Sequence, residues 1–92
     1  WGTKQVMPES WIKLSRRPSV PNPGYGFMNF YLNTGKRSMP NAPESTFWHL
    51  GNGTNAVICL PEEDLVIVVR WVEGGALDGI VQRVLAARAD AK

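Results

Sequence analysis

The fold is decided by residues 56–72, which read AVICLPEEDLVIVVRWV. Two apolar runs, Ala56–Leu60 and Leu65–Val72, are joined by Pro61–Asp64, where the proline suits a type I turn. This pattern predicts an antiparallel β-hairpin. Leu65–Val69 is apolar at every position instead of alternating, which predicts a central strand covered on both faces.

A helix is predicted directly after this hairpin. Gly74-Gly75 ends the second strand, and the apolar residues beyond it recur at helical spacing. These residues are Leu77, Ile80, Val81, Val84 and Leu85. The helix would cover one face of the sheet, and the local candidate for the other face is a short helix predicted over Pro8–Leu14. Because that cover is thin, we expect the chain to be part of a larger fold.

The upstream half is predicted to consist of short strands joined by connectors. Residues 15–24 hold three prolines and form a predicted extended connector. The aromatic-rich segment Tyr25–Leu32 predicts a strand, and Thr46–His49 begins another. The predicted class for residues 1–92, taken as a single segment, is α+β: an antiparallel sheet of three to four strands with a C-terminal helix packed on it.

The composition excludes several classes of function. The net charge is only +2, and the basic pairs Arg16-Arg17 and Lys36-Arg37 lie outside any evident aromatic platform, so nucleic-acid binding is not predicted. A single cysteine, Cys59, excludes an internal disulfide and a cysteine-based zinc site. No metal or other cofactor is predicted, and no run approaches the roughly 20 apolar residues of a membrane span. The start at Trp1-Gly2 suggests a fragment or a processed chain.

The segment His49–Asn55, with the sequence HLGNGTN, is the candidate functional loop. Gly51 and Gly53 allow a sharp turn and a close approach to a ligand. Such a loop either directs backbone N–H groups at an oxyanion or is a plain hairpin corner. His49 is either a hydrogen-bonded structural residue or an acid that acts beside a nucleophile.

Other short patterns have simpler interpretations. Ser10-Trp11-Ile12-Lys13 fits S-x-x-K and Tyr31-Leu32-Asn33 fits Y-x-N, but patterns this short recur by chance, and we assign neither to a catalytic site. The acidic cluster Glu62–Asp64 is expected to be a solvated hairpin tip. Cys59 is expected in the core of the fold.

Taken in order, the motifs resemble the C-terminal part of the serine β-lactamase and penicillin-binding protein family, in its branch of class C-like serine hydrolases and esterases. The matching segments are Pro8–Trp11, Pro18, Pro23–Phe27, His49-x-Gly51-Asn52-Gly53, Pro61–Val69 and the closing helix. The resemblance implies a larger β-lactamase/transpeptidase-like fold of bacterial type. It also implies acyl transfer through an acyl-serine on an ester or amide substrate, without a cofactor.

The resemblance also implies roles for the loop residues. His49 would take the lysine or histidine position that faces the substrate, and Gly51 would let the substrate approach the strand. The backbone N–H of Asn52 would be the second donor of the oxyanion hole. Leu50, which replaces the family's usual Thr, Ser or Gly, and Gly53 would contact the substrate. The nucleophile would lie upstream in the remainder of the same enzyme, so this segment alone is expected to be inactive.

Two alternatives stay open. One is a small non-enzymatic α+β binding module that uses the aromatic side chains of Tyr25, Phe27, Phe30 and Trp48. The other is a miniature enzyme built on Ser10, Lys13 and Tyr31.

Overall fold

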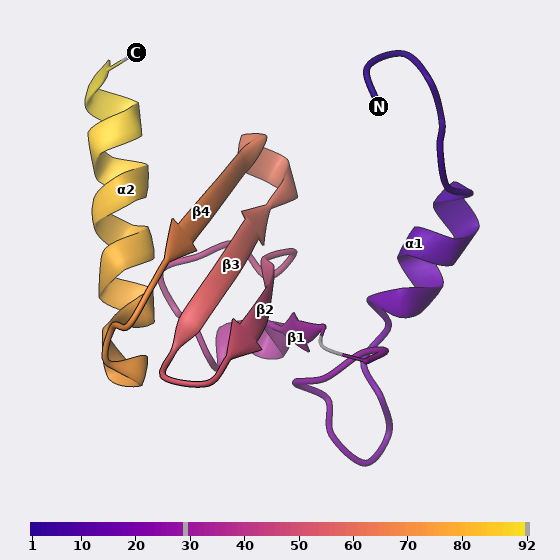
Figure 1. Ribbon diagram of the computed structural model, residues 1–92, viewed down its shortest axis with the longest axis horizontal. Coiled ribbons are helices and arrows are strands. Elements are labelled where there is room, and N and C mark those ends of the chain that lie inside the picture. The colour runs from indigo at the N-terminus through magenta and orange to yellow at the C-terminus, as the bar shows by residue number, and fades with distance from the viewer. Residues whose placement is uncertain (29, 92) are drawn as a thin grey trace.

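A computed structural model describes residues 1–28 and 30–91 of the chain and confirms the α+β class (Figure 1). Four antiparallel strands form one sheet in the order β1-β2-β3-β4. The strands are β1 (Tyr31–Leu32), β2 (Phe47–Gly51), β3 (Asn55–Leu60) and β4 (Leu65–Val69), and the helices are α1 (Glu9–Ser15) and α2 (Leu77–Ala91). Within the described residues, no helix has the length and apolar character needed to cross a membrane.

The predicted hairpin is confirmed as β3 and β4. Ile58 pairs with Ile67 and Leu60 pairs with Leu65 across the two strands. The connection is a short 3₁₀ turn over Pro61–Glu63, and Asp64 takes a left-handed conformation with φ of 48° before β4 begins. The proline therefore starts the turn, as the sequence predicts.

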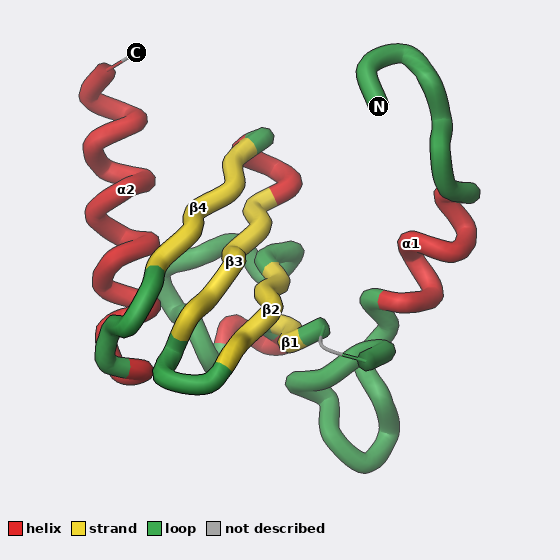
Figure 2. Tube along the Cα trace, in the orientation of Figure 1, coloured by secondary structure: helices red, strands yellow, loops and turns green. Residues whose placement is uncertain are grey.

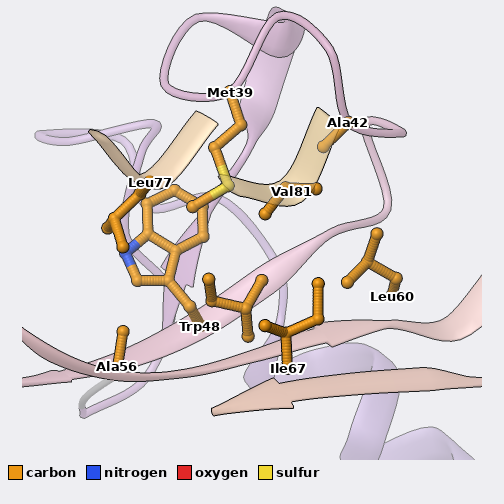
Figure 3. Packing of buried hydrophobic residues seen from close by; sticks show 9 residues of the cluster. Met39, Ala42, Trp48, Ala56, Leu60, Ile67, Leu77 and Val81 are labelled. Atoms are coloured by element: carbon orange, nitrogen blue, oxygen red, sulfur yellow. The ribbon is translucent and has the colours of Figure 1, made fainter. Parts of the chain in front are cut away.

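The core lies on the sheet face that α2 covers (Figure 3). Alternate strand residues point to this face and meet α2 and the loop before β2. The core residues are Met39, Ala42, Trp48, Ala56, Ile58, Leu60, Ile67, Leu77 and Val81. Each fully buried aliphatic side chain contributes about 1.5–3 kcal/mol relative to an exposed one. This layer is therefore the main source of stability, and the predicted apolar face of the C-terminal helix is confirmed at Leu77 and Val81.

A buried amide holds the loop before β2 against this core. The side-chain nitrogen of Asn33 donates to the carbonyl oxygens of Met39 at 2.9 Å and Pro43 at 3.0 Å. Its side-chain oxygen accepts the N–H of Met39 at 2.8 Å. The Asn33 side chain is fully buried, so these bonds replace its hydration and fix the loop that carries Met39 and Ala42.

The prediction of a central strand covered on both faces is wrong. β4 is an edge strand and ends at Val69, and Val66 and Val68 are 59% and 63% exposed. The short helix α1 lies near β1 and β2 and away from β4 (Figure 1), so it gives these valines no cover. An apolar run shows that a strand has two apolar faces, but not whether this chain covers both of them.

The predicted strand Tyr25–Leu32 is also shorter than expected. Only Tyr31 and Leu32 form β1, and Tyr25 makes an isolated bridge to Tyr31. Between them the chain turns back on itself, because the N–H of Gly26 bonds to the carbonyl of Phe30 at 2.8 Å. Much of the segment is therefore loop (Figure 2), and Asn29 lies outside the described residues.

Candidate functional site

His49 lies on the sheet face that α2 leaves open. It pairs with Val57 across β2 and β3, and its neighbour Trp48 points to the opposite, core face. The imidazole packs against two aromatic rings, with ring centres 4.7 Å from Phe30 and 6.3 Å from Phe47. His49 is therefore a half-buried side chain in an aromatic environment.

These rings form part of a groove between α1, the loop that follows it and β2, which we call the β2 groove. It encloses about 640 Å³, within the range of small-molecule sites. Its apolar walls come mainly from Met7, Trp11, Ile12, Phe27, Phe30 and Phe47. Among the described residues that line it, only Arg16 and His49 carry ionisable side chains.

The outer wall of the groove is held by contacts of α1 with Gly26 and Phe27. The carbonyl of Ser15 accepts the N–H of Phe27 at 2.9 Å, and the ring of Trp11 meets the Phe27 ring at 5.8 Å. Gly26 is required here, because a Cβ at this position would lie 2.5 Å from the Ser15 carbonyl oxygen. The glycine of the Tyr25-Gly26-Phe27 motif thus lets the loop dock on the end of α1.

Arg16 is a groove residue that the sequence analysis missed. Its guanidinium carbon lies 5.0 Å from the centre of the Phe47 ring, so the prediction that it lacks an aromatic platform is wrong. Its Nε atom is buried and has no hydrogen-bond partner. Across residues 1–28 and 30–91, no carboxylate forms an ion pair with it. No local signal could reveal this, because Phe47 is distant in sequence.

The loop His49–Asn55 closes the hairpin between β2 and β3. Gly51 pairs with Asn55, and the Asn55 side-chain amide donates to the carbonyl of Asn52 at 2.6 Å. Gly53 has φ of +80°, and the ring of Trp71 packs so closely that a Cβ on Gly53 would lie 2.2 Å from it. The loop is therefore a tight hairpin corner with an exposed Asn52 at its start, and Trp71 is a second residue that the sequence analysis missed.

The five predicted site residues do not share one surface. His49 lines the β2 groove, and Gly51 and Asn52 follow it at the end of the strand. Leu50 points to the α2 side, where it borders a separate hollow of about 290 Å³ together with Thr54. Gly53 faces Trp71 instead of the groove.

The two patterns assigned to chance do not meet in a common cavity. Ser10 and Lys13 are exposed on α1, and Lys13 pairs with Glu9 at 3.2 Å. Tyr31 stacks on Trp48 with ring centres 5.9 Å apart, on the core face, and Asn33 is buried in the loop contacts described above.

Two further expectations are wrong. Trp48 is only 6% exposed and belongs to the core, so it does not share an outer aromatic surface with Phe27 and Phe30. Cys59 lies opposite Phe47 and is half-buried outside the core cluster. Burial raises the pKa of the Cys59 thiol, and the charge of Arg16 opposes that rise, so the thiol is a poor nucleophile at neutral pH.

The described part of the chain contains no group of three or more His, Cys, Asp or Glu side chains that could hold a metal ion. No protein-family model, curated protein or solved structure matches this chain. The chemistry of the β2 groove and of the strand end that follows His49 is therefore the basis for assigning a function.

Proposed function

We propose that this chain is the C-terminal part of a serine hydrolase related to the β-lactamases and penicillin-binding proteins, in the class C-like esterase branch. The enzyme would transfer an acyl group from an ester or amide to a serine that lies outside this chain. The observation that carries the proposal is the placement of His49. Its side chain lies on the open sheet face, beside a groove, immediately before the strand end at Gly51 and Asn52.

Each of these residues has a distinct role in the proposal. The imidazole of His49 donates a hydrogen bond or a proton to the reacting group. Gly51 has no side chain, so a substrate can lie along the end of β2. The N–H of Asn52 stabilises the oxyanion, and loss of one such donor typically slows acyl transfer by about 10²–10³-fold.

Exposed side chains on the open face support the proposal that another part of the enzyme completes the site. Val57, Val66 and Val68 form an exposed apolar area next to the strand that carries His49. Exposed apolar areas of this kind mark surfaces that another part of a protein covers. A part of the enzyme that packs here would bring a serine to the same face as His49.

Covalent labelling tests the proposal. The chain alone, treated with a fluorophosphonate or a fluorescent penicillin, is expected to show no stoichiometric adduct. A polypeptide extended upstream of Trp1 is expected to react at the serine of an S-x-x-K motif that is followed downstream by Y-x-N. In that polypeptide, His49→Gln slows the reaction, whereas Ser10→Ala leaves it unchanged. Stoichiometric modification of Ser10 would overturn the proposal.

A non-enzymatic binding module is the second candidate, because the β2 groove by itself, without a further part of an enzyme, has the volume and apolar lining of a small-molecule site. Ligand binding by the chain, together with an extended polypeptide that no acylating probe labels, would favour this candidate over the hydrolase.

A further inference from the structure

We infer that the β2 groove binds small amphipathic carboxylates, with an aromatic or aliphatic body inside the groove and the carboxylate on the guanidinium of Arg16. This binding does not require the proposed hydrolase activity. The binding itself concerns residues of this chain alone.

The walls of the groove select the apolar body. Trp11 and Phe27 form an edge-to-face pair on the outer wall, and Phe30 and Phe47 pack 5.4 Å apart on the inner side. Aromatic walls favour flat apolar groups through area burial and ring contacts. The volume of about 640 Å³ is large enough for a molecule of one or two fused rings.

Arg16 selects the charge. Its Nε atom is buried and unpartnered, and the described residues place no carboxylate within ion-pair distance of its guanidinium. No carboxylate of the described residues neutralises this guanidinium, so its charge is available to an anionic ligand, which would bind the outer nitrogens because the buried Nε is closed to solvent. Phe47 lies beneath the guanidinium at 5.0 Å and holds it at the groove by a cation–π contact.

The nearby acidic side chains form no ion pair with Arg16 among the described residues. Arg16 also borders a second hollow, of about 480 Å³, which Lys13, Glu44 and Glu62 line. Glu44 accepts the N–H of Gly35 at 2.6 Å, and Glu62 accepts the hydroxyl of Ser45 at 2.7 Å. The β2 groove has no acidic residue among its described lining, so an anion approaches Arg16 from that side without repulsion.

A carboxylate suits this position better than a neutral or cationic group. The planar guanidinium matches the two oxygens of a carboxylate, and hydrogen bonds between charged groups are stronger than neutral ones. We therefore expect the chain to bind a carboxylate at least about tenfold more tightly than the carboxamide of the same shape.

Isothermal titration with three probes of one shape tests this inference: naphthoate, naphthamide and naphthylmethylammonium. The unaltered chain is expected to bind naphthoate most tightly and the ammonium compound most weakly. Arg16→Gln removes the preference for naphthoate over naphthamide while naphthamide binding persists, which also shows an intact groove. Arg17→Gln, at the exposed neighbouring arginine, is the matched control and keeps the preference.

Arg16→Lys keeps the positive charge and is expected to retain part of the preference, which covers the case in which Arg16→Gln does not fold. Equal binding of naphthoate and naphthamide by the unaltered chain would overturn the inference, as would a preference that survives in a folded Arg16→Gln variant. Titration involves no turnover. If the chain prefers the carboxylate but the extended polypeptide transfers no acyl group, only the hydrolase proposal is refuted. If an acylating probe labels the extended polypeptide but the chain shows no preference for the carboxylate, only the binding inference is refuted.

Discussion

The two faces of one sheet differ in what covers them. On the α2 face, Ile58 and Leu60 are fully buried beneath α2 and the loop that Asn33 holds. On the other face, Val57 in β3 and Val66 in β4 are 39% and 59% exposed, and the groove beside His49 is open. Apolar side chains form both faces, yet only the first is a core. Residues of the α2 face therefore stabilise the fold, and residues of the open face are available for binding.

The largest expected difference between the faces comes from one pair of adjacent residues. Ile58→Ala removes a fully buried side chain from the α2 face and is expected to lower the free energy of unfolding by about 2–5 kcal/mol. Val57→Ala, on the open face of the same strand, is expected to cost less than about 1 kcal/mol. Urea unfolding followed by circular dichroism measures both. Equal losses would show that the open face is also a core.

A smaller loss is expected from the amide that fixes the covering loop. Asn33→Ala leaves the carbonyls of Met39 and Pro43 and the N–H of Met39 without their partner. We expect a loss of about 2–3 kcal/mol in the same unfolding measurement. The matched control is Asn52→Ala, in the exposed turn, with an expected loss below about 0.5 kcal/mol. A neutral Asn33→Ala would mean that the loop does not depend on this amide.

The hairpin corner after β2 is expected to contribute less. Gly53→Ala forces a side chain into a left-handed conformation and against the exposed ring of Trp71, which can move aside. We expect a loss of about 1 kcal/mol. Gly75→Ala meets no atom within 4 Å and lacks a positive φ, so it serves as the control with no measurable loss. An unchanged stability for Gly53→Ala would show that the corner is not held as described.

The smallest effect on stability is expected on the open face. The double variant Val66→Thr and Val68→Thr keeps β-branched side chains at two exposed positions and should change the free energy of unfolding by less than about 1 kcal/mol. Because it reduces the exposed apolar area, it should lower self-association in light scattering. A cooperative loss of several kcal/mol would indicate that these valines are buried in solution.

The sequence predicted those parts of the fold that depend on local pattern. The helical spacing of Leu77 and Val81 placed α2, and Pro61 placed the turn between β3 and β4. The cover of β4 could not be predicted in this way. The run Leu65–Val69 is equally apolar whether its second face meets this chain, another part of a protein or solvent.

The candidate site was predictable only in part. His49 is the single histidine and adjoins a glycine turn, so local sequence identified it. Arg16 reaches the same groove because the loop after α1 returns to Ser15 and β2 brings Phe47 beneath the guanidinium. Those contacts join residues far apart in the chain, and no short-range spacing encodes them.

We propose that the function of this chain resides on the sheet face that α2 leaves open. Methyl NMR spectra of the chain, recorded during a titration with naphthoate, test it most directly. Shifts are expected at Met7 and Ile12, which line the β2 groove, and none at Ile58 and Val81, which lie in the core. Shifts confined to the hollow around Leu50 on the α2 side, or an absence of shifts at the groove methyls, would contradict it.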